Sequence, residues 1–386
     1  MTTWLEDRVF AVVAGAAVGD ALGGATEGYT PEAIEERYGG RVTGIVPPFF
    51  ADWQTRRPIS PYHKGDGHVT DDTLMTQTLI EVYADRRDHL DAFAMAEDFA
   101  PRLVSEVRWI PELERETVLL NRIFLAEKWL VTRLVYGHID PREAGVGNIV
   151  NCGAAMYMAP VGVVNAGDPD AAYREAIDMG GAHQSSYGRE AAGVFAAAVA
   201  ASLTRGATTD TVVDTVLRLS HDGTHDALVA VKEAVRALPE TASDADIARA
   251  IRNAVRTYDT VGERYREPAP DARIPSRTKS IEELPAAIGM LIAYDSDYRS
   301  AVLGAVNYGR DSDSIASMAG AVAGALGGSS VVPEEWSGTI AKASRMDFHA
   351  SARLLSSAAS DILARDRTKA SSTLERIDLL VGGVTI

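Results

Sequence analysis

The segment that most constrains the fold is a run of small residues behind a polar cluster, late in the chain. Residues 311–314 (Asp-Ser-Asp-Ser) precede residues 315–325, which have a helical composition but include Gly320 and Gly324. Each glycine costs a helix about 1 kcal/mol relative to alanine, so a helix that keeps two of them is expected to pack closely against its neighbours. Asp and Ser cap helices, but two carboxylates and two hydroxyls exceed what one cap needs, and such oxygens also bind hard cations. We therefore predict a buried helix that presents a carboxylate pair to a site.

The composition favours a large helical core. The 386 residues are 46% hydrophobic and rich in alanine, and only 7% are aromatic. The net charge of −16 and the pI near 5.0 argue against nucleic acid or an anionic membrane as partners. The chain has a single cysteine, Cys152, so no internal disulfide can form, which fits a reducing compartment.

The apolar residues 9–22 are predicted to form a buried first helix. Glu6 and Asp7 precede them and Asp20 interrupts their end, whereas a signal peptide would have a basic leader. No uninterrupted apolar run approaches the roughly 18 residues that a membrane span needs. We expect a soluble, cytoplasmic protein.

Almost every periodic segment of the chain has a helical spacing. Helices are predicted at 4–22, 74–83, 91–104, 112–137, 189–204, 208–219, 224–238, 243–256, 283–294 and 298–306, with helical pieces after residue 328. Residues 28–69 are predicted to be mostly irregular, with aromatic residues that favour an ordered loop, and 260–280 to be another loop. The apolar tail 377–386 is expected to form a short strand or an oligomer contact. The simplest architecture is a single all-α domain, 1–386, with long loops on one side.

Three acidic places lie at helix ends or in glycine-flanked loops. They are Glu27, the pair Asp71 and Asp72, and the pair Asp311 and Asp313. If they converge, close like charges would raise one another's pKa unless cations intervene, and two Mg²⁺ ions suit a set of oxygen ligands. The histidines near the acidic stretch are too isolated to be preferred over oxygen, and zinc is unlikely because no Cys/His cluster has ligand spacing. The alternative is a set of independent helix caps.

Several motifs together resemble the ADP-ribosylglycohydrolase family. They are Gly-Asp-Ala-Leu-Gly at 19–23 with Glu27, Thr-Asp-Asp-Thr at 70–73, Asn-Cys-Gly-Ala-Ala-Met at 151–156 with Pro160, His183, and Gly-Arg-Asp-Ser-Asp-Ser at 309–314. The resemblance spans about residues 5–330, with 331–386 as a C-terminal helical extension. It implies an all-α fold, a compact orthogonal helical bundle with long loops around a binuclear Mg²⁺ site.

The resemblance also implies roles for individual residues. The metal ligands would be Thr70, Asp71, Asp72, Asp311, Asp313 and Ser314. The catalytic residues would be Glu27, Asp72 and Asp311, and the substrate would contact Asn151, Gly153, His183 and Arg310. Two positions depart from the family pattern, since Tyr157 stands where an arginine is frequent and Arg310 where glycine is commoner. Both bear on the substrate more than on the metals.

The function expected from this resemblance is Mg²⁺-dependent hydrolysis of an N- or O-glycosidic bond to ribose. The substrate would be a ribosyl or ADP-ribosyl compound, either small or attached to a protein. Because the family includes members without catalysis, the alternative is a non-catalytic binder of ADP-ribose-like ligands. The filled metal positions favour an enzyme.

Overall fold

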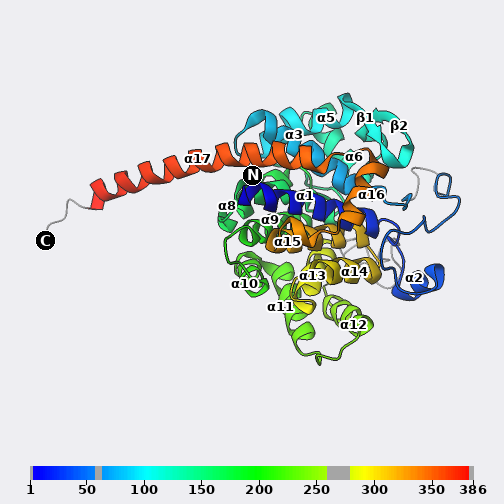
Figure 1. Ribbon diagram of the computed structural model, residues 1–386. Helices are drawn as coiled ribbons and strands as arrows, with labels where there is room; N and C mark the ends of the chain where they lie inside the picture. Colours follow the sequence, from blue (N-terminus) through cyan, green and yellow to red (C-terminus); the bar gives the residue numbers. More distant parts are fainter. Residues whose placement is uncertain (1–2, 57–62, 259–278, 382–386) are drawn as a thin grey trace.

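The computed structural model describes residues 3–56, 63–258 and 279–381, and these fold almost entirely into helices (Figure 1). The prediction of an all-α fold is confirmed. The longer helices are α1 (Trp4–Gly23), α2 (Pro31–Tyr38), α3 (Asp71–Arg86), α5 (Ala100–Ser105), α6 (Leu125–Val131), α7 (Ala159–Val164), α8 (Pro169–Gly181), α9 (Ser186–Ser202), α10 (Thr209–Leu219), α11 (Asp222–Arg236), α12 (Asp244–Val255), α13 (Lys279–Ala293), α14 (Tyr298–Tyr308), α15 (Ser312–Gly327), α16 (Glu334–Ser344) and α17 (Phe348–Val381).

Short helical pieces fill the connections between these helices. They are α4 (Ala92–Ala94), the π-helical turns η1 (Met95–Phe99) and η4 (Thr132–Tyr136), and the 3₁₀ turns η2 (Pro111–Leu113), η3 (Leu119–Asn121), η5 (Cys152–Ala154) and η6 (Ser329–Val331).

Helices α1 and α15 form the centre of the molecule (Figure 1). From Val9 onward α1 is mostly apolar and almost wholly buried, and so is α15, as expected for helices surrounded by others. Their backbones approach so closely that a Cβ atom on Gly320 would lie 2.3 Å from the carbonyl oxygen of Gly15, and one on Gly324 2.3 Å from that of Ala11. The predicted close packing of the small-residue helix is therefore confirmed, and the two glycines are what permits it.

The prediction of one continuous helical segment over 112–137 is wrong. Its beginning holds the turn and second strand of a hairpin, in which β2 (Arg115–Val118) pairs antiparallel with β1 (Val107–Ile110), with Val107 opposite Val118. The hairpin turn places Glu114 in the left-handed conformation, with a φ of 50°, which interrupts a right-handed helix. Periodicity alone did not show these breaks.

The segment predicted to be irregular, 28–69, contains the helix α2. Thr30 caps its start and Pro31 occupies the first turn, while Gly39 ends it at φ 73°. These are standard start and stop residues, so the sequence carried the signal. The loop after α2 is ordered by aromatic packing, as predicted, because Phe49 stacks on Tyr29 with ring centroids 3.4 Å apart.

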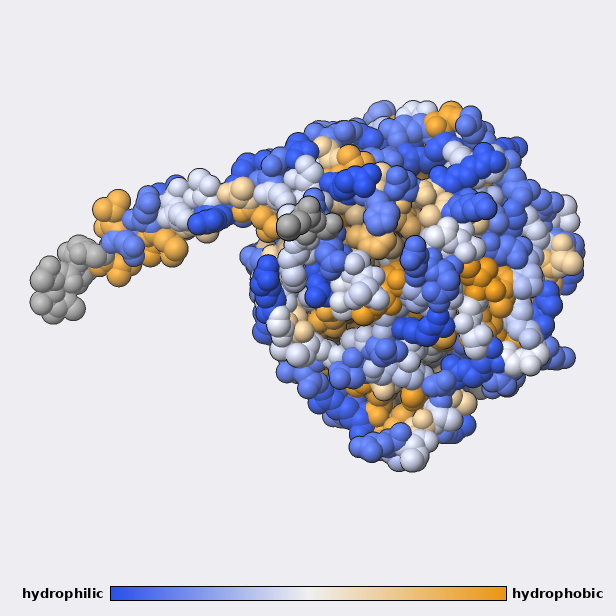
Figure 2. Space-filling view, in the orientation of Figure 1, coloured by the Kyte–Doolittle hydropathy of each residue, from blue (hydrophilic) through white to orange (hydrophobic). Residues whose placement is uncertain are grey.

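The C-terminal helix α17 is half core and half projection. Its first half packs on α1, α3 and α7 and buries residues as far as Ile362. Residues 367–381 are exposed and extend away from the body, and their tip is apolar (Figures 1 and 2). The expectation of a strand is wrong for 377–381, which continue the helix, and 382–386 lie outside the described residues. Most of the loop predicted at 260–280 also lies outside them.

Candidate metal centre and active site

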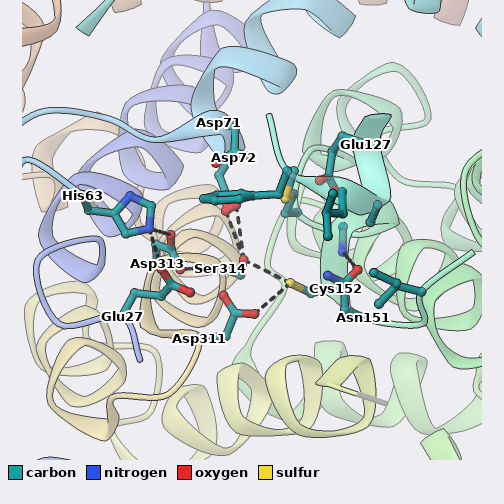
Figure 3. A pocket seen from close by; sticks show the side chains of 16 residues that line it. Glu27, His63, Asp71, Asp72, Glu127, Asn151, Cys152, Asp311, Asp313 and Ser314 are labelled. Carbon is teal, nitrogen blue, oxygen red and sulfur yellow. Dashed lines mark hydrogen bonds and ion pairs between the residues drawn. The ribbon is translucent and has the colours of Figure 1, made fainter. Parts of the chain in front are cut away.

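Three segments far apart in the sequence meet at one cavity of about 190 Å³ (Figure 3). Glu27 follows the end of α1, Asp71 and Asp72 open α3, and residues 311–314 open α15. The cavity lining includes Glu27, Asp71, Asp72, Asn151, Gly153, Asp311, Asp313 and Ser314. The structure thus brings together the three acidic places that the sequence singled out.

The start of α3 is fixed by Asp20, which belongs to α1. The backbone N–H of Thr70 donates to Asp20 Oδ2 at 3.0 Å, and the N–H and hydroxyl of Thr73 donate to the same carboxylate. Thr70 is the N-cap of α3, and its hydroxyl oxygen accepts from the N–H of Asp72 at 3.3 Å. Burial raises the pKa of Asp20, and the threonine hydrogen bonds oppose that rise. Thr70 is fully buried behind the lining residues.

The start of α15 is joined to the loop that carries Glu27. The N–H of Gly28 donates to the carbonyl of Arg310 at 2.5 Å, and the N–H of Arg310 donates to the carbonyl of Tyr29 at 2.9 Å. Gly309 has a φ of 72°, and a Cβ atom there would lie 2.1 Å from the Tyr29 carbonyl oxygen, so only glycine fits. This junction holds Glu27 and the acidic residues of α15 in one rigid unit.

The first residues of α15 do more than cap it. Asp311 occupies the N-cap position of this described helix, yet its side chain makes no capping hydrogen bond there. Ser314 instead donates from its hydroxyl to Asp72 Oδ1 at 3.0 Å, which links α15 to α3. The interpretation of Asp311 as a mere helix cap therefore lacks the hydrogen bond that would define it.

The buried carboxylates lie close enough to share cations. Two groups whose candidate ligand atoms all lie within 4.8 Å of one another are Asp20, Asp72 and Asp313, and Cys152, Glu283 and Asp311. Burial raises the pKa values of Asp72 and Asp313 well above those of exposed aspartates, and the negative charges of neighbouring carboxylates raise them further. Burial also raises the pKa of Asp71 to about 7, against the opposing charge of Arg122. Cations would remove this repulsion, so these residues fit a metal centre.

Of the four residues predicted to bind substrate, two line the cavity and two, His183 and Arg310, do not. Asn151 and Gly153 line the cavity, and the side-chain oxygen of Asn151 accepts from the N–H of Gly153 at 3.0 Å. His183 is fully buried behind the lining, where its Nδ1 lies 3.0 Å from the Tyr157 hydroxyl.

The side chain of Arg310 is also absent from the described lining of the cavity. Its Nε donates to Glu282 Oε2 at 2.9 Å, so the guanidinium is bound to α13. Arg310 has a φ of 60°, which explains why its side chain departs from the direction of its acidic neighbours.

Sequence reasoning missed a buried network beside the cavity. His63 lies between Glu27 and Glu112, with Nε2 2.5 Å from Glu27 Oε2 and Nδ1 2.9 Å from Glu112 Oε1. Arg122 forms ion pairs with Glu112 and, at 3.1 Å, with Asp71. Glu112 and Arg122 lie in the segment wrongly predicted as one helix, so periodicity did not indicate that they contact the lining residues His63 and Asp71.

Cys152 lies in the cavity wall and is buried, as predicted. Its Sγ is 3.3 Å from Asp311 Oδ2 and 3.2 Å from Ser314 Oγ. Burial and the charge of Asp311 raise the pKa of this thiol well above its usual range, so it stays protonated and is not a reactive thiolate.

Comparison with known proteins decides the family. The sequence matches the model of the ADP-ribosylglycohydrolase family over residues 1–371. The chain belongs to the ADP-ribosylglycohydrolase family. It is therefore a glycosidic hydrolase of ADP-ribosyl compounds, and the resemblance seen in the motifs is confirmed. The family is metal-dependent, in agreement with the acidic groups that could hold metal ions in this ADP-ribosylglycohydrolase.

Two individual matches cover most of the chain. An uncharacterized protein of Archaeoglobus fulgidus is 28% identical over 341 residues, which are 86% of this chain and 91% of the relative. A solved structure described as an ADP-ribosylglycohydrolase-related protein complex has a TM-score of 0.59 at 20% identity, and the match covers 92% of this chain and 99% of that one. At that identity the second match shows the fold alone. Within the described residues, no helix is both long and apolar enough to cross a bilayer.

Proposed function

We propose that this ADP-ribosylglycohydrolase uses two Mg²⁺ ions to cleave an N- or O-glycosidic bond to ribose. Its substrate would be an ADP-ribosylated protein or a smaller ribosyl or ADP-ribosyl compound. The observation that carries this proposal is the convergence of Asp71 and Asp72 with Asp311, Asp313 and Ser314 around one cavity (Figure 3). Thr70, directly before the aspartate pair, would complete the ligand set.

The negative charge gathered at the cavity supports the proposal that the active enzyme binds cations there. Six carboxylates line the cavity, namely Glu27, Asp71, Asp72, Glu127, Asp311 and Asp313. All six are at most 9% exposed, so water screens their repulsion poorly. Oxygen ligands of this kind suit Mg²⁺, which takes carboxylates and water in octahedral geometry. Bound there, the ions would supply positive charge to hold ribose hydroxyls and to stabilise charge that develops during cleavage.

Glu27 is the residue proposed to act closest to the anomeric carbon. Glycoside hydrolysis passes through an oxocarbenium-like state, while water adds to the sugar carbon and the leaving group departs with a proton. The Glu27 carboxylate lies in the cavity wall, where it could accept a proton from the attacking water. Asp72 and Asp311 lie in the wall formed by the starts of α3 and α15, where they would orient the ribose. Asn151 and Gly153 would contact the substrate from η5.

The direct test is the release of ADP-ribose from a panel of N-linked and O-linked ADP-ribosyl compounds, with Mg²⁺ and with EDTA. We expect turnover of at least one class with Mg²⁺ and none with EDTA. If ADP-ribose binds but no compound turns over, the protein is the non-catalytic binder that the sequence left open.

A sharper test separates a metal ligand from a helix cap. Asp311→Asn should lower kcat by at least about 100-fold, since even outer partners of metal ligands commonly contribute 10–100-fold. The matched control is Asp297→Asn, because Asp297 caps α14 by accepting from the N–H of Ser300 at 3.0 Å. Circular dichroism should be unchanged for both proteins. If the Asp311→Asn protein is as active as the Asp297→Asn protein, Asp311 is not a metal ligand.

A further inference from the structure

We propose that His63 is a nitrogen ligand of the ion beside Glu27, so that this position prefers a first-row transition ion over Mg²⁺. The inference rests on the metal centre of the proposed function and refines one of its two ion positions. It changes a site built from oxygen ligands into a mixed site of nitrogen and oxygen.

The ring of His63 points into the acidic cluster (Figure 3). Its Nε2 lies 2.5 Å from Glu27 Oε2 and 3.6 Å from Asp313 Oδ2. The candidate ligand atoms of these three residues all lie within 4.8 Å of one another, and His63 is only 5% exposed. The His63 nitrogen and the Asp313 carboxylate, on two different segments, can therefore reach one ion, with the Glu27 carboxylate beside it.

The other ring nitrogen of His63 is held as it is in known metal-binding histidines. Such histidines usually donate their second N–H to a carboxylate, which fixes the ring and makes the first nitrogen a better ligand. Here Nδ1 lies 2.9 Å from Glu112 Oε1, and Glu112 is itself 2% exposed. Although burial lowers the pKa of His63, the charges of Glu112 and Glu27 raise it to about 10, so without an ion Nε2–H donates to Glu27. An ion at this position would displace the Nε2 proton, while Nδ1–H stays bonded to Glu112.

Two further contacts fix the Glu112 carboxylate where it can accept a hydrogen bond from His63. Its carboxylate accepts from the N–H of Lys64 at 3.1 Å and forms an ion pair with the buried Arg122. Although burial alone would raise the pKa of Glu112, Arg122 and His63 lower it to about 2. Arg122 Nη2 also lies 3.1 Å from His63 Nδ1, but the ionised Glu112 is the acceptor available to a proton on that nitrogen.

Ligand chemistry gives the expected metal preference. Mg²⁺ binds oxygen ligands and retains water, whereas imidazole suits Fe²⁺, Ni²⁺, Cu²⁺ and Zn²⁺. Mn²⁺ is the weakest binder of the first row, so a nitrogen bond to Mn²⁺ is the most demanding test of the site. The competing arrangement is a protonated His63 that serves only as a counter-ion between Glu27 and Glu112. The two arrangements differ in whether a bound ion contacts nitrogen.

The test is pulsed electron paramagnetic resonance of Mn²⁺ bound to the full-length protein, which detects a directly coordinated nitrogen. We expect nitrogen coupling in the wild type, with the frequencies moved when histidine is labelled with ¹⁵N. His63→Gln should lose this coupling and bind Mn²⁺ about 10–100-fold more weakly, with a much smaller change for Mg²⁺. The control is His68→Gln, because His68 lies on the same loop but bonds to the Gly65 carbonyl and is not among the lining residues described.

The outcomes separate this inference from the proposed function. Mn²⁺ that binds without nitrogen coupling in the wild type overturns the role of His63, while Mg²⁺-dependent hydrolysis can still stand. Failure of the protein to bind any divalent ion overturns both. The labelled wild type gives the answer even if His63→Gln does not fold.

Discussion

The contact between α1 and α15 gives a prediction whose size can be worked out from the structure. A Cβ atom on Gly320 would lie 2.3 Å from the Gly15 carbonyl oxygen, about 1 Å closer than the 3.4 Å at which ordinary van der Waals contact begins. The obstacle is main chain in the middle of a buried helix, so no side chain can rotate away. Gly320→Ala therefore requires the two central helices to separate.

The expected cost follows from two opposing effects. Overpacking a well-packed core typically costs about 1–3 kcal/mol, and a backbone obstacle argues for the upper end. Alanine returns about 1 kcal/mol because it is a better helix former than glycine. We expect Gly320→Ala to lower the free energy of unfolding by about 2 kcal/mol, with weaker metal binding because the acidic residues at the start of α15 move with the helix.

The assay is urea unfolding followed by circular dichroism, with the midpoint and slope compared between variants. The matched control is Gly338→Ala in α16, where an added Cβ atom would meet nothing within 4 Å. That variant should be more stable than the wild type by up to about 1 kcal/mol. If Gly320→Ala is as stable as Gly338→Ala, the helices can separate without cost and the reasoning is refuted.

Two further predictions concern α17. His89 lies between Glu175 at 2.6 Å and Asp366 at 2.9 Å, and these hydrogen bonds, that of Glu175 first, raise its pKa to about 9. A pKa raised on folding adds stability that is complete below about pH 6.5 and is lost as the pH rises through about 9. His89→Gln should therefore lower the free energy of unfolding at pH 6 but not at pH 10, as measured by urea unfolding. The expected loss at pH 6 is only about 1 kcal/mol, because solvent screens a side chain that is 35% exposed. An equal loss at both pH values would contradict this prediction. We also propose that the chain is one domain with 331–386 as a C-terminal extension, and that only the part before Arg367 supports the fold. A chain ending at Arg367 should keep the unfolding midpoint and hydrolase activity of the full protein, and a loss of either would show that the projecting part is needed.

Much of the candidate site could be predicted because its signals are local. The pairs Asp71 and Asp72, and Asp311 and Asp313, stood out as helix starts with more oxygen atoms than a cap needs. Part of that signal was a true cap, since Thr70 does cap α3. Spacing alone left convergence and independent helix caps both open, and the resemblance to the family favoured convergence.

The rest depended on contacts between distant segments. His63 was judged isolated because its partners Glu112 and Arg122 lie just before and just after β2, in the segment that periodicity had predicted as one helix. Arg310 illustrates the opposite error, because its place inside the acidic motif said nothing about the direction of its side chain. That direction depends on a positive φ and on Glu282, whose side chain is presented by α13.

Close helix packing and the concentration of negative charge are two aspects of one arrangement. Carboxylates that repel one another would move apart if their segments could shift, but Asp20 and Asp313 belong to two helices whose backbones are already in contact. The loop after α1 is bonded to the start of α15 through Gly28 and Arg310, so Glu27 is also fixed. Rigid elements of this kind keep ligand atoms within the small tolerance that a metal site needs. The glycines of α1 and α15 therefore contribute to the site although none of their atoms needs to touch a metal.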